Sequence, residues 1–431
     1  MGQIIIFLVV ILALLAVPIA AVLGLLAIGL DQIYMYGRLR AGLAEITWSK
    51  SSEFLFVAVP MFILLGEIIL RSGVSERMYA AVTKWISWLP GGLMHANIAS
   101  SAIFAATSGS SVATAATVGT VAYPEIEKNN YNESLFLGSV AAGGTLGILI
   151  PPSIALVIYG LLTDTSVPEL YLAGIVPGMV LAFLFSLLIV SICRYRHDWG
   201  GRRITSNWRE KWKSLPDLLP PIILFLGVVG SIYTGIATPT EAAAIGVMIS
   251  LGIAAYFKSL SFQMLIEAFE ATMRTTAMIM IIIFAALFLN FVLGVLGITR
   301  EIVGFINGIG LSPILTIYII VLVYVIMGMF METVAMLLTT VPIVFPIVIG
   351  LGVPEYNGVW FGILVTLLME TALITPPIGI NLYVVQSIRK RGGSFNDVAL
   401  GALPFVLAIL GMIVILIHFP KIALWLPEIF Y

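Results

Sequence analysis

Charged residues, cysteine and histidine are all scarce in this sequence. Only 10% of its 431 residues are charged, whereas soluble domains carry about 25%. The single cysteine, Cys193, excludes an internal disulfide framework and a cysteine-based metal site. The three histidines, at positions 95, 197 and 418, lie far apart, so neither haem nor zinc has an obvious set of ligands. No stretch is polar enough to form a soluble domain.

Hydrophobic residues make up 60% of the chain, and the mean hydropathy is +1.11. Apolar runs of roughly 20 residues, the length that spans a hydrocarbon core of about 30 Å, recur along the whole sequence. They fall near residues 4–30, 53–70, 95–123, 134–160, 172–193, 218–236, 239–257, 274–296, 312–349, 358–384 and 402–425. We therefore predict an all-α polytopic membrane protein. The first run is too long for a signal-peptide core, and we interpret it as a retained first span.

Two of these runs are interrupted in their middle by small or polar residues. The run 95–123 contains TSGSS at 107–111, and the run 312–349 contains GMFMET at 328–333. A span broken in this way can turn back as a re-entrant hairpin whose tip is buried in protein. We predict hairpin tips near residues 108–111 and 328–333.

The distribution of basic residues supports this interpretation. The strongly polar connector 194–213 carries seven Lys or Arg and is expected to be cytoplasmic. Threading the chain outward from it, with both hairpins returning to their own side, puts sixteen Lys and Arg inside and five outside. If either hairpin were a single crossing, several basic loops would move to the wrong side.

The two halves of the chain look like duplicates at an offset of 225 residues. Tyr131 then matches Tyr356, and the paired prolines at 151–152 match those at 376–377. An odd number of crossings separates the copies, so the second is inverted, as in many secondary transporters. We predict a first repeat at 1–193 with a broken helix at 134–160, a linker at 194–213, and a second repeat at 214–431 with a broken helix at 358–384.

Each half pairs a hairpin tip with a proline break, and both features supply oxygen atoms. Proline and glycine release backbone carbonyls from the helical ladder, and in a bilayer these carbonyls need a partner. Carbonyl and hydroxyl oxygens suit Na⁺ better than a soft transition metal. Two related cages, at 108–111 with 143–152 and at 328–333 with 369–377, therefore predict at least two Na⁺ ions and no transition metal.

The breaks also predict where a solute binds. A half-helix that restarts after a break presents free N–H groups and a partial positive charge, which suit a carboxylate. Few arginines lie within the spans, so dipoles, hydroxyls and co-bound cations would have to hold an anionic solute. We expect the solute near Pro151, Pro152, Ser153, Pro376, Pro377 and Asn381.

Each of these features also has a purely structural explanation. Small residues favour close helix packing in membranes, and proline kinks are tolerated there. Glu241 has the spacing of a helix cap and is more easily explained as a cap than as a proton relay. Among the acids within apparent spans, Glu332 and Glu370 are better functional candidates than Glu67, because they neighbour the second cage.

Four segments carry a resemblance to a known family. They are SGSSVATAATVGTVAYPE at 108–125, AAGGTLGILIPPSIALVIYG at 141–160, ATPTEAAAIGV at 237–247 and ETALITPPIGINLYV at 370–384. With these segments the chain resembles, over essentially its full length, the large membrane subunit of tripartite ATP-independent periplasmic (TRAP) transporters.

The resemblance implies an elevator transporter in the bacterial inner membrane, with a scaffold and a mobile domain powered by a Na⁺ gradient. It also implies a small four-helix membrane subunit, a periplasmic substrate-binding protein, and a carboxylate solute such as a C4-dicarboxylate, sialic acid or another sugar acid. No nucleic acid is expected as a partner. The ion-binding residues that it implies are Ser108, Gly109, Ser110, Ser111, Gly143, Gly144 and Thr145 for one site, and Gly328, Met331, Glu332, Thr333, Met369, Glu370, Thr371 and Thr375 for another.

Three other functions remain open at this point. A stand-alone Na⁺/carboxylate transporter of related architecture would need no binding protein. An intramembrane enzyme would need a nucleophile with a base, and Ser108 and His95 have only proximity in sequence to recommend them. A channel is disfavoured because broken helices of this kind bind and move a solute rather than line a continuous pore. We therefore expect a transporter and not an enzyme.

Overall fold

The computed structural model describes residues 17–202, 206–298, 301, 304, 310–389 and 392–431. Within these ranges the chain is helical and forms no strand, which confirms the predicted all-α class. Residues 4–16 of the first apolar run lie outside the described residues. The same holds for four residues of the charge count, Arg203, Arg300, Lys390 and Arg391. The side of the membrane on which each loop lies stays a prediction.

The breaks in the helices fall where the sequence predicts them. The run 95–123 is divided into two helices, and so are the runs 134–160, 312–349 and 358–384. The first half contains α2 (Ile19–Met35), α3 (Arg40–Ser51), η1 (Phe54–Val57), α4 (Ala58–Arg71), α5 (Val74–Ile86), α6 (Leu93–Ser108), α7 (Ser111–Ala122), α8 (Glu125–Lys128), α9 (Glu133–Thr145), η2 (Leu146–Ile148), α10 (Ile154–Thr163), α11 (Val167–Tyr195) and η3 (His197–Trp199).

The second half begins with short helices and continues with longer ones. These are α12 (Trp208–Ser214), η4 (Leu215–Leu218), α13 (Leu219–Phe225), η5 (Leu226–Gly230), α14 (Ser231–Tyr233), α15 (Pro239–Tyr256), α16 (Phe262–Val295), α18 (Pro313–Gly328), α19 (Thr333–Gly350), α20 (Gly358–Leu373), α21 (Ile380–Ile388), α22 (Phe395–His418) and α23 (Lys421–Phe430). Across the described ranges, seven helical segments are long and apolar enough to cross a membrane.

Three features of the helices were not predicted. Helix α3 follows the first span and has no buried residue, so its sequence contains no apolar run from which it could be predicted. Helix α16 begins at Phe262, twelve residues before the predicted apolar run at 274, because Gln263, Glu267 and Glu270 interrupt the apolar residues of its first turns. The run 402–425 is divided into α22 and α23 at Pro420, where the missing N–H ends a continuous helical ladder.

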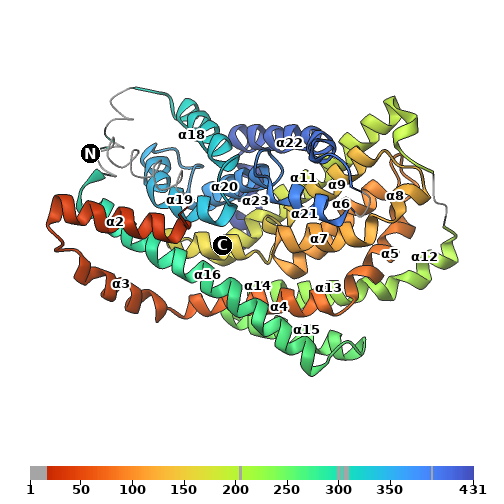
Figure 1. The fold of residues 1–431 in the computed structure, drawn as a ribbon, viewed down its shortest axis with the longest axis horizontal. Coiled ribbons are helices and arrows are strands. Elements are labelled where there is room, and N and C mark those ends of the chain that lie inside the picture. Colours follow the sequence, from red (N-terminus) through yellow and green to blue (C-terminus); the bar gives the residue numbers. More distant parts are fainter. Residues whose placement is uncertain (1–16, 203–205, 299–300, 302–303, 305–309, 390–391) are drawn as a thin grey trace.

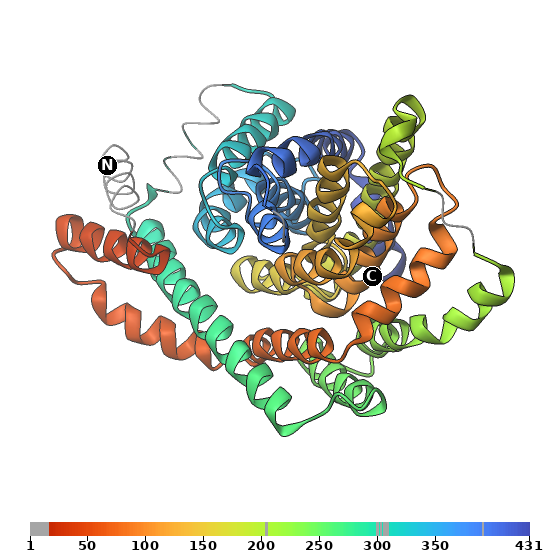
Figure 2. The same cartoon turned by 45° about the vertical axis from the view of Figure 1, so that its right-hand side comes forward.

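The helices form two groups that lie side by side (Figures 1 and 2). Helices α2, α3, α4, α15 and α16 run along one side of the molecule, with α16 packed on both α2 and α4. We call these five the outer group. Helices α6, α7, α9, α10 and α18–α22 form a compact body, the inner group, in which α9 is surrounded by α6, α7, α21 and α22. The two groups meet where α4 contacts α6 and α10 and where α16 contacts α19.

Close backbone contact holds α9 against α22 at the centre of the inner group. A Cβ atom on Gly401 would lie 1.9 Å from the carbonyl oxygen of Ser134, and one on Gly138 would lie 2.1 Å from the carbonyl oxygen of Gly401. Only glycine fits at either position, which is the packing that small residues allow between membrane helices. The two halves of the chain are therefore joined along one tight seam.

Arg389 joins the same helices at one end. Its side chain is 6% exposed and pairs with Glu133, at the start of α9, and with Asp397, near the start of α22. The N–O distances are 2.6 and 3.0 Å. The hydrogen bond to Glu133 raises the pKa of the Arg389 guanidinium. These two ion pairs therefore connect the end of α21 to both α9 and α22.

Candidate functional site

The first tip is a two-residue turn between α6 and α7. Gly109 has a φ of 60°, which favours glycine, and Ser110 caps α7 by accepting a hydrogen bond from the N–H of Ala113. The hydroxyl oxygens of Ser108 and Thr114 lie 3.0 Å apart across the turn. The tip is thus built from hydroxyls and carries no charged side chain.

The first tip lies directly against the first break. The Ser111 hydroxyl donates to the carbonyl oxygen of Thr145 at 3.0 Å. A Cβ atom on Gly109 would lie 2.9 Å from the carbonyl oxygen of Pro152, and one on Gly147 would lie 2.8 Å from the Ser110 backbone. The predicted partners 108–111 and 143–152 are therefore brought together by contacts of their backbones.

Within the first break, hydroxyls satisfy several of the freed carbonyls. Helix α9 ends at Thr145, whose hydroxyl donates to the carbonyl oxygen of Ala142. Ser153 caps α10 and donates to the carbonyl oxygen of Ile148. The Pro151–Pro152 peptide bond is cis, as is that of Pro376–Pro377 in the second half. Gly143 and Gly144 are buried in the last turn of α9.

The second tip differs from the first in charge. Helix α18 ends at Gly328, and Glu332 caps α19. The Glu332 carboxylate accepts from the N–H of Ala335 at 2.8 Å and from the Thr333 hydroxyl at 3.0 Å. A carboxylate at the start of a helix offsets the partial positive charge of its N–H groups. The Ser110 hydroxyl cannot do this at the first tip.

The second break contacts the second tip, as its counterpart does. The N–H of Ile378 donates to the carbonyl oxygen of Met329 at 3.2 Å, and a Cβ atom on Gly328 would lie 2.7 Å from that of Ala372. Thr371 and Thr375 each donate to a carbonyl oxygen one turn earlier, of Leu367 and of Thr371. The second tip and break are thus also brought together.

Two buried polar side chains near the second break have unusual surroundings. Glu370 is 0% exposed, and neither of its carboxylate oxygens has a hydrogen-bond partner among the described residues. An isolated buried carboxylate is costly, so such a group requires a cation or a proton nearby. Asn381 donates to the carbonyl oxygen of Ala141 in α9 at 3.1 Å, which links the second break to the first half.

A cavity of about 420 Å³ lies where the two tips meet the outer group. Seven of the predicted site residues line it, namely Ser108, Gly109, Ser110, Ser111, Glu332, Thr333 and Met369. The other predicted residues do not line it. These are Gly143, Gly144, Thr145, Pro151, Pro152, Ser153, Gly328, Met331, Glu370, Thr371, Thr375, Pro376, Pro377 and Asn381.

The outer group supplies a wall of this cavity that was not predicted from the sequence. Ile63, Gly66 and Glu67 of α4 line it, together with Thr275 and Met278 of α16. These two helices are about 200 residues apart in the sequence, and neither carries a motif. The available signal is Glu67, an acid within an apolar run, although the sequence favours Glu332 and Glu370 over it as functional candidates.

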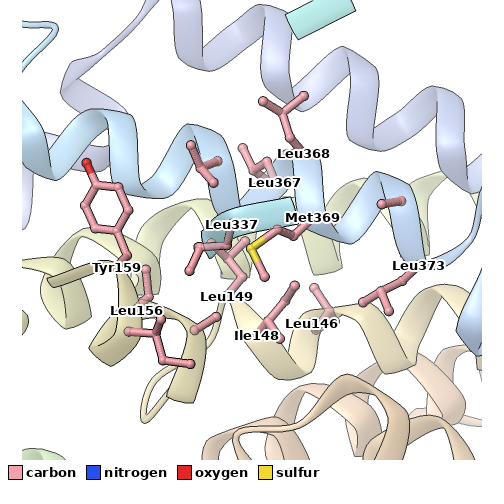
Figure 3. Close-up of a cluster of buried hydrophobic side chains, with 14 of the residues drawn as sticks. Leu146, Ile148, Leu149, Leu156, Tyr159, Leu337, Leu367, Leu368, Met369 and Leu373 are labelled. Carbon is pink, nitrogen blue, oxygen red and sulfur yellow. The ribbon is translucent and has the colours of Figure 1, made fainter. Parts of the chain in front are cut away.

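An apolar cluster supports the cavity from the inner group (Figure 3). Leu146 and Ile148 of the first break lie beneath Met369 and Leu373 of α20 in the second half. Leu373 and Met369 also line the cavity, as does Ile148. The first break is therefore packed on the helix that leads into the second, so the two halves build one site.

The arrangement does not assemble a nucleophile with a base at Ser108. His95 and Ser108 lie thirteen residues apart on α6, which is about 20 Å along a helix axis. The His95 Nε2 atom is 2.8 Å from the carbonyl oxygen of Pro90. Among the described residues, no group of three or more His, Cys, Asp or Glu is placed to hold a metal ion.

Comparison with known proteins gives consistent relationships. Residues 5–422 match the family model described as "Tripartite ATP-independent periplasmic transporter, DctM component". The C4-dicarboxylate TRAP transporter large permease protein DctM of Pseudomonas aeruginosa is 33% identical over 387 residues, which are 90% of this chain and 89% of that protein. The sialic acid TRAP transporter large permease protein SiaM of Vibrio cholerae is 30% identical, over 88% of this chain and 87% of the relative.

A solved structure shares the fold. The Alcanivorax borkumensis YdaH transporter superimposes with a TM-score of 0.62, covering 87% of each chain at 15% sequence identity. At this level of identity the likeness concerns the architecture of the helices alone. It agrees with the all-helical membrane fold that the sequence predicts.

Proposed function

The chain belongs to the tripartite ATP-independent periplasmic transporter family as a DctM component, and we propose that it imports an organic anion by Na⁺-coupled secondary transport. It is a multi-pass protein of the inner membrane. The relatives are named as large permeases for C4-dicarboxylates and sialic acid. These names support transport rather than an enzymatic reaction, and a carboxylate as the solute.

The cavity between the two tips is the observation that carries this proposal. Its lining includes the hydroxyls of Ser110 and Ser111, which can bond a carboxylate or a sugar hydroxyl. The first tip has an uncharged cap and leaves the dipole of α7 free to attract an anion. The solute therefore binds with its carboxylate toward Ser110 and Ser111, at the start of α7.

Sodium ions occupy the two places where a tip contacts a break. Each place is rich in hydroxyl and carbonyl oxygens, which are the ligands of a hard cation. The second also holds the carboxylates of Glu332 and Glu370, of which Glu370 has no partner among the described residues. Bound Na⁺ would neutralise these charges and allow an anion to enter a cavity that has no Lys or Arg in its lining.

The two groups of helices suggest how the site changes sides. In an elevator motion the inner group, which contains both tips and both breaks, slides along the outer group. The cavity lies between the groups, so such a motion would carry the solute past α4 and α16. A small membrane subunit and a periplasmic binding protein complete the tripartite assembly, and the binding protein delivers the solute.

Reconstitution into proteoliposomes tests the proposal. The chain is incorporated with its small membrane subunit, its binding protein is added outside, and uptake of labelled succinate and labelled sialic acid is measured with an inward Na⁺ gradient. We expect uptake of one of these anions that disappears when K⁺ replaces Na⁺.

Three results would each contradict one part of the proposal. Full uptake by the chain without the other two components would contradict the tripartite assembly and favour a stand-alone transporter. Equal uptake in Na⁺ and in K⁺ would contradict sodium coupling. If the complete system carried a neutral solute and neither of the two anions, anion transport would be contradicted.

A further inference from the structure

One cluster of charged side chains in the wall of the cavity takes no part in the ion and solute binding proposed above. Glu67 of α4 lines the cavity, and Arg71, one turn further along α4, forms an ion pair with it. Arg71 also lies 3.8 Å from the carboxylate of Glu267 in α16. The side chains of Glu67 and Arg71 are 22% and 25% exposed, so the pair is largely shielded from solvent.

The pair determines the charge that the outer wall shows to the solute. Glu67 and Glu332 are the charged side chains of the cavity lining, and both are acidic. The Glu332 carboxylate is already partnered, because it accepts hydrogen bonds from the N–H of Ala335 at the start of α19 and from the Thr333 hydroxyl. Glu67 caps no helix, and Arg71 is the cation that the structure places against it. Without Arg71, an uncompensated negative charge would face a bound anion.

We propose that Arg71 and Glu67 form a charge-selective wall, in which Arg71 cancels the carboxylate that would otherwise repel an anionic solute. This inference deepens the proposed function and rests on it. In a cavity that is partly shut off from water, charges interact more strongly than in bulk solvent. Arg71 is thus a specificity residue that acts through Glu67, and Glu267 holds it in position from α16.

The wall makes two single variants act in opposite directions. Arg71→Ala leaves Glu67 unpaired and raises the KM for an anion by about tenfold, because one unit of negative charge then faces the solute. Glu67→Gln removes the same charge and leaves Arg71 nearby, so the KM falls below that of the wild type. The double variant Glu67→Gln with Arg71→Ala has a neutral wall and returns the KM toward the wild-type value.

The test uses the complete three-component system in proteoliposomes, with whichever of labelled succinate and labelled sialic acid the wild type carries. We expect the KM for that anion to change and kcat to change little. Arg274→Ala is the matched control, because it removes an i,i+4 pair with Glu270 on the surface of α16, where the side chains are 81% and 62% exposed. This control leaves the KM unchanged.

The outcomes separate a wall that selects charge from a merely structural pair. If Arg71→Ala is folded and has the wild-type KM, or if the double variant is as impaired as Arg71→Ala alone, the inference is wrong. If Arg71→Ala does not fold, Glu67→Gln alone decides, since a KM that does not fall contradicts the inference. Wild-type uptake that is equal in Na⁺ and in K⁺, or uptake of a neutral solute and of neither anion, would instead refute the proposed function before any variant is compared.

Discussion

Hydroxyls at the first tip and carboxylates at the second make the two halves of the site chemically unequal. Ser110 caps α7, whereas Glu332 caps α19. At the offset of 225 residues, Thr145 occupies the position of Glu370. All the carboxylates of the two tip-and-break pairs therefore belong to the second half. On electrostatic grounds the second half suits the cation best, and the first half leaves a helix start free for the anion.

Removing one hydroxyl from either tip tests the placement of the ions. Ser108→Ala and Thr333→Ala each delete an oxygen that lines the cavity. We expect the Na⁺ concentration for half-maximal uptake to rise about fivefold in each, the effect of losing one neutral polar contact worth about 1 kcal/mol. Sodium titration of uptake at saturating solute measures it.

Thr120→Ala is the control for these variants. Thr120 is exposed on α7, and its hydroxyl donates to the carbonyl oxygen of Ala116 within the same helix. The Thr120→Ala variant therefore loses a hydroxyl of the same kind away from the cavity, and its Na⁺ response should match that of the wild type. An unchanged Na⁺ response in both tip variants would argue against sodium ions at the tips.

Among the helices, α9 and α22 depend on the closest contact. Because a Cβ atom on Gly401 would lie 1.9 Å from the Ser134 carbonyl oxygen, Gly401→Ala must push the two backbones apart. We expect it to lower the free energy of unfolding by about 2–3 kcal/mol, the cost of overpacking a tight interface. Thermal unfolding of the purified chain in detergent shows this as a lower Tm.

Gly411→Ala provides the comparison on the same helix. A Cβ atom on Gly411 has no neighbour within 4 Å, and alanine favours a helix over glycine by about 1 kcal/mol. We expect the Tm of this variant to equal or exceed that of the wild type. Equal Tm losses in the two variants would mean that the seam between α9 and α22 is not the source of the effect.

The helices show how far the sequence alone can lead. The breaks at 146–153 and 374–379 are predictable, because paired prolines in the middle of an apolar run remove hydrogen bonds from the helical ladder. Hydroxyl-rich tips are recognisable for the same local reason. The wall built by Glu67 and Thr275 is not predictable, because α4 and α16 meet only through tertiary packing. The pairing of Gly138 with Gly401 has the same origin, since either glycine alone reads as a helix-weakening residue.

At the level of the whole molecule, the inner group assembles from both halves of the chain. Arg389 ties α21 to α9 and α22, and Asn381 bonds the first half from the second. The outer group contacts this body through α4, which packs on α6 and α10, and through α16, which packs on α19. Such an arrangement suits a body that moves as one unit beside a separate support, which is the motion that we propose.

A measurement of ion coupling tests the proposed Na⁺-coupled transport most directly. Radioactive sodium and labelled solute are followed together in vesicles that contain the complete three-component transporter. Because each half of the chain provides one tip-and-break pair, we predict that at least two Na⁺ ions enter with each solute molecule, and that neither species enters without the other. Solute entry at an undiminished rate in sodium-free vesicles would contradict the proposal.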